Sequence, residues 1–143
     1  MPALKKATQP KKVSAAKGKD FDEVFCALRK LLDAHGDQLA VQTDKPGNYH
    51  TMIPSVLHRG KPIYFAGVRT GKNYVSYHLM SVYTSPELLK GMSPELKKRM
   101  QGKSCFNFKT VDQDCFAELR RLTAAGLKKF KSEEFRRNIE AMQ

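Results

Sequence analysis

The sequence predicts an α+β fold with two layers, in which an antiparallel-rich sheet of about five strands has the N- and C-terminal helices packed on one face. Apolar residues recur at helical spacing near both ends of the chain, whereas the middle alternates with the period of strands. Glycine and proline turn signals separate the alternating segments. The 143 residues, 41% hydrophobic and 28% charged, have the size and composition of one soluble domain.

The first predicted helix begins at Asp20, whose carboxylate can accept the unpaired amide hydrogens of the first turn. Its apolar stripe consists of Phe21, Val24, Phe25, Leu28, Leu31, Leu32 and His35. We expect Gly36 to end the helix as its C′ residue. The acidic side chains fall on the opposite arc, so they line the solvent face of an amphipathic helix.

Four strands are expected next, at residues 39–44, 49–53, 62–69 and 73–80. Pro46 and Gly47 predict a type II turn, because proline fixes the first φ and glycine takes the positive φ. We expect Pro54 to stop the second strand, with an irregular connection over residues 55–61 that turns at Arg59 and Gly60.

Two Ser-Pro-Glu-Leu sequences predict tandem short helices. Ser85 and Ser93 are the expected caps, with proline at the first helical position and glutamate near the positive end of the dipole. Gly91 and Gly102 are expected to close the two helices.

The C-terminal part predicts a strand at residues 104–109 and a long helix capped by Asp112. Glycine inside a helix costs about 1 kcal/mol relative to alanine, so Gly126 indicates close packing against the sheet. A new helix start, or a kink, is expected at Ser132.

Charge is unevenly distributed along this chain of net charge +12. Residues 1–19 carry six lysines and no acid, and they predict a flexible basic tail before a single domain at residues 20–143. Residues 20–44 have a net charge of −4 and residues 45–143 a net charge of +10. The N-terminus lacks the apolar core of a signal peptide and no segment is long enough to span a membrane, so we expect a cytoplasmic protein.

No catalytic signature is recognisable, which favours a non-enzymatic protein. The chain lacks the GxSxG, HExxH, Walker and GxGxxG motifs. Its three cysteines, Cys26, Cys105 and Cys115, have no CxxC spacing, which argues against a disulfide framework and a zinc cluster and favours core positions.

A candidate ligand site lies on the predicted strand at residues 73–80. Side chains alternate along a strand, so Tyr74, Ser76 and His78 share the face opposite to the helices. Tyr64, Phe106 and Phe108 are expected on the same open face. The rim is expected to carry Lys72, Lys103 and Lys109, which could neutralise a small anion. The alternative is that His78 is a hydrogen-bonded structural residue.

The acidic face of the first helix is a candidate site for weak cation binding. Its carboxylates are Asp22, Glu23, Asp33 and Asp37. Hard cations prefer oxygen ligands of this kind. The alternative is an ordinary solvated helix face.

The basic tail and the later lysines and arginines are a candidate surface for nucleic acid or another polyanion. Many lysine and arginine side chains could bind phosphate groups, and aromatic side chains near them can stack on unpaired bases. Without a helix-turn-helix, ribonucleoprotein or zinc-finger signature, such binding would be nonspecific.

Three blocks of the chain resemble the YdhG-like domain family, a bacterial group of small proteins. They read TDKPGNYH, GKPIYFAGVRTGKNYVSYHLMSVY and LLKGMSPELKKRMQGKSCFNFK. The resemblance covers roughly residues 20–130 and implies a single two-layer α+β domain in a bacterial cytosol. Some members are described as frataxin-like iron chaperones that bind iron through exposed carboxylates, which here implies iron at the four first-helix acids.

The leading hypothesis is therefore a cytosolic, non-enzymatic binding protein of the YdhG-like type that handles iron through the first-helix carboxylates. One alternative is a nonspecific nucleic-acid or polyanion binder that uses the basic tail and the basic surface. The other is a protein that binds a small anionic ligand on the open sheet face.

Overall fold

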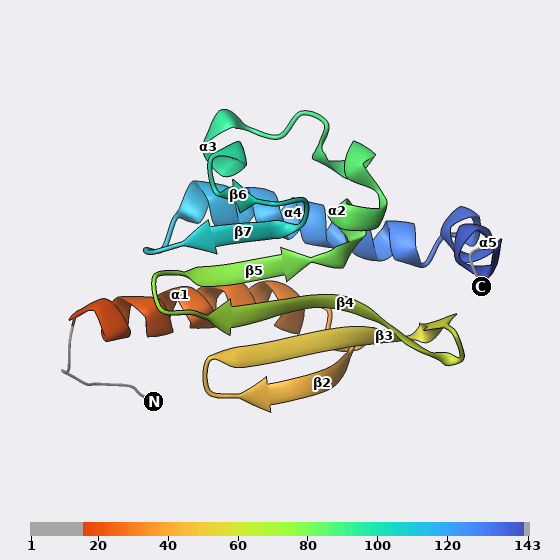
Figure 1. Ribbon diagram of the computed structural model, residues 1–143, viewed down its shortest axis with the longest axis horizontal. Helices are drawn as coiled ribbons and strands as arrows, with labels where there is room; N and C mark the ends of the chain where they lie inside the picture. Colours follow the sequence, from red (N-terminus) through yellow and green to blue (C-terminus); the bar gives the residue numbers. More distant parts are fainter. Residues whose placement is uncertain (1–15, 142–143) are drawn as a thin grey trace.

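The computed structural model describes residues 16–141 and confirms the predicted fold class. An antiparallel sheet forms one layer, and the long helices lie along one of its faces (Figure 1). The sheet has six strands rather than about five, because residues 100–101 form a short edge strand that alternation did not indicate. None of the helices in the described range combines the length and apolar character that a membrane span requires.

The strands, in chain order, are β2 (Ala40–Lys45), β3 (Asn48–His58), β4 (Lys61–Thr70), β5 (Val75–Leu79), β6 (Met100–Gln101) and β7 (Cys105–Phe108). The helices are α1 (Ala16–Asp33), α2 (Met80–Thr84), the 3₁₀ helix η1 (Pro86–Leu89), α3 (Pro94–Lys97), α4 (Gln113–Phe130) and α5 (Glu133–Ala141). In the sheet the order is β2-β3-β4-β5-β7-β6, so the first four strands form a meander and β7 pairs with β5.

The core lies between the sheet and the helices α1 and α4, which run behind the strands in Figure 1. Val24 and Leu28 of α1 and Leu119 of α4 are fully buried there. Burial of a large apolar side chain contributes about 1.5–3 kcal/mol, so this layer supplies most of the driving force for folding.

The alternation predicted for β5 is confirmed. Val75, Tyr77 and Leu79 are completely buried, whereas Ser76 and His78 are partly exposed on the other face. The expectation that Phe106 and Phe108 lie on the open face is wrong, because both are buried in the core. Strand register explains the difference, since Phe106 is paired with Tyr77 and Phe108 with Val75, and directly paired residues point to the same side.

The first helix differs from its prediction at both ends. It begins at Ala16, one turn before Asp20, so residues 16–19 of the predicted tail are helical and residues 1–15 lie outside the described range. Gly36 is not in the left-handed conformation. The chain instead leaves the helix through successive turns, in which the amide of His35 donates to the carbonyl of Leu32.

The strand β3 continues through Pro54, so the predicted stop at that residue is wrong. Proline has no amide hydrogen for the ladder, and the pairing with β4 jumps from Ile53–Ile63 to Leu57–Pro62. Proline is therefore accommodated in a bulge. The turn at Arg59 and Gly60 is confirmed, with positive φ values of 55° and 79° that suit a two-residue hairpin.

The two tandem helices form with different caps. Ser93 caps α3 as predicted, because its hydroxyl accepts a hydrogen bond of 3.1 Å from the amide of Leu96. Ser85 makes no such bond and begins only the short η1. Gly102 does not close the second helix, since α3 ends at Lys97 and Gly102 turns the chain between β6 and β7.

The long helix α4 begins as predicted, with the Asp112 side chain accepting from the amide of Cys115. Gly126 allows a close approach of α2. A Cβ atom at Gly126 would overlap with the Ser81 hydroxyl and lie 2.8 Å from the Ser81 Cβ, whereas the Phe65 ring of the sheet would be 3.9 Å away. The Ser81 hydroxyl is buried and has no hydrogen-bond partner in the described part of the chain. Close packing is thus present, chiefly against α2.

We predict that Gly126→Ala destabilises the fold by about 1–3 kcal/mol, because overpacking outweighs the better helix propensity of alanine. Ser81→Ala should stabilise it by about 1 kcal/mol by removing an unpaired buried hydroxyl. Urea unfolding of each variant measures these changes. A gain of stability in Gly126→Ala would contradict the close approach of α2 and α4.

Candidate functional site

The open face of the sheet carries a depression of about 460 Å³. No long helix of the described chain covers this face, which is turned away from α1 and α4 (Figure 1). The residues that line it are Gln42, His50, Tyr64, Gly67, Arg69, Ser76, His78, Met80 and Cys105. Two of the three central residues predicted for a ligand site, Ser76 and His78, are therefore brought together there.

The first cluster of polar side chains on this face, His50 and Tyr64, lies over Gly67. A Cβ atom at this position would overlap with Nδ1 of His50 and lie 2.6 Å from the Tyr64 hydroxyl, so a larger residue does not fit. His50 Nε2 donates to Asn48 Oδ1 at 2.7 Å, which leaves Nδ1 to accept from the Tyr64 hydroxyl at 2.8 Å. Glycine thus lets two side chains meet across the strand.

The second group surrounds His78. Its Nδ1 lies 3.3 Å from Sγ of Cys105, and its Nε2 lies 3.5 Å from the hydroxyl of Ser104. The Tyr64 ring packs edge-on against the imidazole, with the ring centroids 5.6 Å apart. His78 is therefore held in place on three sides.

The third group joins β5, β6 and β7. Ser76 donates a hydrogen bond of 2.6 Å to Asn107 Oδ1, and Asn107 donates one of 2.7 Å to Gln101 Oε1. The hydroxyl of Tyr74 donates to the same Gln101 oxygen at 3.1 Å. Tyr74 therefore lies beside the depression rather than in its lining, and the hydroxyls of Tyr74 and Ser76 already have partners within the protein.

Partial burial sets the charge state of this face. Desolvation lowers the pKa of His50, with Arg69 adding to the effect, and desolvation lowers the pKa of His78, with His50 adding to it. Burial raises the pKa of the Tyr64 hydroxyl, and burial raises the pKa of the Cys105 thiol. At neutral pH these four groups are uncharged hydrogen-bonding groups.

Arg69 supplies the positive charge in the depression. It is exposed at the end of β4, opposite Ser76 in the strand register. Its guanidinium forms no hydrogen bond or ion pair with any other described residue. None of the described residues that line the depression is acidic. This combination suits an anion, because a guanidinium binds carboxylate or phosphate through two parallel hydrogen bonds.

The three predicted rim lysines are exposed, but they do not form one group. Lys72 lies in the turn between β4 and β5, and Lys109 follows β7. The pairing of Val75 with Phe108 places both at the end of the sheet where Arg69 lies. Lys103, between β6 and β7, lies at the opposite end.

The carboxylates predicted to bind a metal are Asp22, Glu23, Asp33 and Asp37, and all four are exposed. A helical rise of about 1.5 Å per residue separates Asp22 from Asp33 by roughly 16 Å. Oδ1 of Asp33 accepts a hydrogen bond from the Tyr49 hydroxyl, and Oδ2 of Asp33 lies 3.7 Å from Nε of Arg29. Within residues 16–141, no three His, Cys, Asp or Glu side chains are grouped to hold a metal ion. Iron binding stays a prediction.

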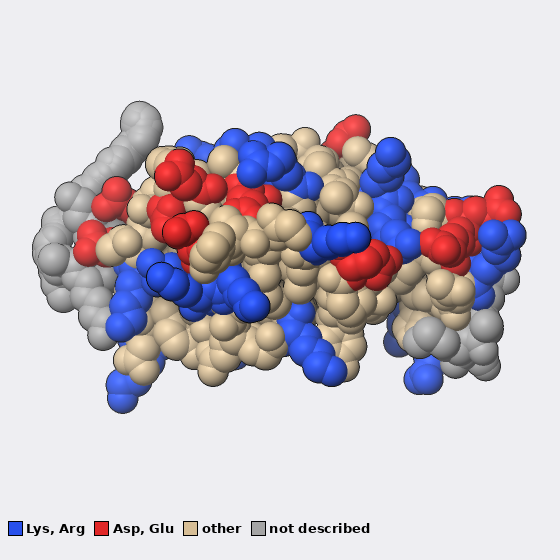
Figure 2. Space-filling view, turned by 90° about the horizontal axis from the view of Figure 1, so that it is seen from above, with Lys and Arg blue, Asp and Glu red and all other residues tan. Residues whose placement is uncertain are grey.

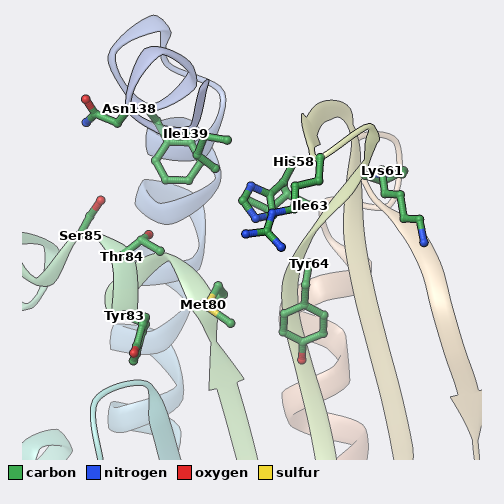
Figure 3. A pocket seen from close by; sticks show the side chains of 13 residues that line it. His58, Lys61, Ile63, Tyr64, Met80, Tyr83, Thr84, Ser85, Asn138 and Ile139 are labelled. Carbon is green, nitrogen blue, oxygen red and sulfur yellow. The ribbon is translucent and has the colours of Figure 1, made fainter. Parts of the chain in front are cut away.

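A larger cleft of about 1150 Å³, which the sequence did not indicate, opens between α2, α5 and the end of the β3–β4 hairpin (Figure 3). Its walls come from segments far apart in the sequence. Tyr64 and Met80 line this cleft as well as the open-face depression, so the two hollows adjoin.

We predict that folding stability depends on His50 and His78 at mildly acidic pH. Their pKa values are lower in the folded than in the unfolded chain, so protonation favours unfolding. Their full contribution is present above about pH 6.5 and declines as the pH falls toward the lowered folded pKa values. Urea unfolding between neutral pH and pH 5 measures this, and the double variant His50→Gln, His78→Gln should flatten the profile. An unchanged profile in that variant, or one flattened equally by His35→Gln, would contradict the assignment.

Comparisons with known proteins find no relative that could help to interpret this site. A scan against protein-family models matches no family. Searches of curated proteins and of solved structures find no match to the chain either. The resemblance to the YdhG-like family therefore stays a prediction, and the proposed function rests on the contacts of the open face.

Proposed function

We propose that this chain is a non-enzymatic binding protein that holds a small anionic ligand on the open face of its sheet. The observation that carries the proposal is the guanidinium of Arg69, which has no hydrogen-bond or ion-pair partner among the described residues and lies in a depression where none of the described lining residues is acidic. Ser76 and His78 form its floor. Membership of the YdhG-like family and a cytoplasmic location belong to the same proposal.

The size and rigidity of the depression support a small ligand. Its volume of about 460 Å³ lies within the range of about 300–1,000 Å³ that is usual for small-molecule sites. Its floor is held by cross-strand hydrogen bonds, including those of His50 and Ser76. Since these groups are already ordered, a ligand would lose little binding energy to rearrangement of the protein.

The protonation state of the Cys105 thiol supports ligand binding rather than catalysis. Cys105 and His78 are close enough to form a nucleophile and base pair. However, burial raises the pKa of the Cys105 thiol, which therefore keeps its proton at neutral pH. A reactive cysteine has the opposite shift, so we assign Cys105 a structural part in the floor.

On the face drawn in Figure 2, the distribution of charge does not favour a nucleic-acid interface. Figure 2 shows basic side chains in separate groups, with acidic side chains between them, on the face seen from above. A nucleic-acid surface usually presents a continuous basic patch or stripe. The predicted contribution of residues 1–15 to polyanion binding lies outside the described part of the chain.

We predict that Arg69→Gln weakens the binding of inorganic phosphate and of malonate about tenfold or more. A charge-assisted hydrogen bond to such an anion contributes about 1.5–3 kcal/mol, and the glutamine removes the charge. Isothermal titration calorimetry at low ionic strength measures the affinity of each probe for the full chain.

The matched control is Arg120→Gln, which removes an exposed arginine from α4, in the helix layer away from the open face. It should leave both affinities unchanged. Equal weakening by the two variants would show that the anions respond only to net charge, and equal binding by wild type and Arg69→Gln would exclude Arg69 as the contact.

A further inference from the structure

We propose a metal site on the open face of the sheet that binds a soft monovalent ion, Cu(I), through Cys105, His78 and Met80. The three side chains line the same depression as Arg69, but the metal site does not use the guanidinium. His78 lies two residues further along β5 than Ser76, the partner of Arg69, a separation of about 7 Å. Metal binding here is therefore independent of anion binding at Arg69.

The strongest observation is the geometry of the pair formed by His78 and Cys105. The two residues are directly paired across β5 and β7, so their side chains point to the same side of the sheet. Nδ1 of His78 lies 3.3 Å from Sγ of Cys105. A nitrogen and a sulfur ligand on one ion, at the bond lengths of about 2.0 and 2.3 Å found in zinc sites, lie about 3.5–3.8 Å apart. A small increase in the separation therefore places both atoms at ligating distance from one ion.

Met80 offers the third donor atom. It follows His78 by two residues, at the junction of β5 and α2, and it lines the depression together with His78 and Cys105. Figure 3 shows the sulfur-bearing side chain of Met80 where β5 ends. This side chain is half-buried and unbranched, so rotation about its bonds can turn the thioether toward the pair. The depression thus combines an imidazole, a thiol and a thioether.

The surroundings of His78 resemble those of a metal-ligating histidine. Such a residue usually directs its second ring nitrogen at a hydrogen-bond partner, which fixes the orientation of the ring. Nε2 of His78 lies 3.5 Å from the Ser104 hydroxyl, and the Tyr64 ring packs edge-on against the imidazole. With Nδ1 on a metal, the ring proton is on Nε2, where the Ser104 hydroxyl can accept it. The ring is therefore oriented before a metal binds.

The donor atoms select a soft ion over a hard one. Thiolate and thioether sulfurs favour Cu(I), whereas Mg²⁺ and Ca²⁺ prefer oxygen ligands, and none of the described lining residues is acidic. Structural zinc sites take four ligands. Within residues 16–141, no three His, Cys, Asp or Glu side chains are grouped to supply them.

Charge selects a monovalent ion over a divalent one. A cysteine ligates as the thiolate, so metal binding releases the proton of the Cys105 thiol. A monovalent ion then leaves the net charge of the depression unchanged. A divalent ion adds a positive charge on the same face as the Arg69 guanidinium, which repels it.

The experiment titrates the full chain with Cu(I) under anaerobic conditions, in competition with the chromophoric chelator bicinchoninate. The parent protein carries Cys26→Ser, because Cys26 is exposed on α1 and could bind the ion as a single ligand. The parent should bind one Cu(I) per chain. Since changes even outside the ligand shell cost about 10–100-fold in affinity, Cys105→Ser should weaken binding at least about a hundredfold and His78→Gln at least about tenfold.

Met80→Leu should weaken Cu(I) binding at least about threefold, because leucine keeps the size of the side chain and removes only the sulfur. The matched control is Met92→Leu, which changes a partly buried methionine outside the depression and should have no effect. Equal affinity of the parent and Cys105→Ser would overturn the site. Weakening by Cys105→Ser with none by His78→Gln or Met80→Leu would also overturn it, since the ion would then bind a single thiol.

A measurement on the parent protein alone covers the case in which a variant does not fold. Ag(I), a redox-stable ion of the same class, is added to isotope-labelled protein and followed by nuclear magnetic resonance. The methyl signal of Met80 and the imidazole signals of His78 should shift together and saturate at one equivalent, and the methyl signal of Met92 should stay constant. Saturable Ag(I) binding that leaves Met80 and His78 unshifted would contradict the proposal.

Arg69→Gln separates the metal site from the anion site. In the Cys26→Ser parent it should leave the Cu(I) affinity unchanged within about twofold, since the guanidinium is not a ligand. Failure of the wild-type chain to bind phosphate would therefore leave the Cu(I) result standing. Loss of Cu(I) binding in Arg69→Gln as large as in His78→Gln would contradict a metal site built on the sulfur and imidazole donors.

Discussion

The hydrogen bond between Tyr77 and Thr123 is the constraint on which the arrangement of the sheet depends. The two hydroxyl oxygens lie 2.6 Å apart and both residues are completely buried. A buried hydroxyl without a partner costs about 1–3 kcal/mol, so β5 cannot reverse its faces without losing this bond along with its apolar contacts. Because side chains alternate along a strand, Tyr77 in the core places Ser76 and His78 on the open face.

Irregularities in strand pairing determine which other side chains lie on the open face beside Ser76 and His78. Thr51 is paired with Ala66 and Met52 with Tyr64, so Phe65 occupies a bulge in β4. The bulge puts Tyr64 on the same face as Gly67 and Arg69, where it meets His50 and His78. A second irregularity, at Pro54, precedes the hairpin end that lines the neighbouring cleft. Both hollows thus lie beside places where the β3–β4 pairing departs from regularity.

Local chemistry explains which parts of the fold were predictable from the sequence. Gly47 has the expected positive φ of 71° after Pro46, and the caps at Ser93 and Asp112 form because each depends on only a few neighbouring residues. The alternation of β5 was predictable for the same reason. The register that buries Phe106 and Phe108 was not, since it depends on pairing with a strand some thirty residues away.

The candidate site was only partly predictable for the same physical reason. Ser76 and His78 follow from regular alternation, but Arg69 does not, because the bulge at Phe65 reverses the faces of β4 beyond it. His50 required the register between β3 and β4. The apolar cleft combines residues from near 60, 80 and 137, and no local pattern relates them.

The most direct measurement of the open-face site is a nuclear magnetic resonance titration of isotope-labelled protein with inorganic phosphate. If Arg69 holds the anion in the depression, the guanidinium signal of Arg69, the amide of Gly67 and the imidazole signals of His50 and His78 shift together and saturate. The signals of His35 and His58, which lie outside the depression, should stay constant. Shifts spread over exposed lysines without saturation, and none at Arg69, would contradict anion binding at this site.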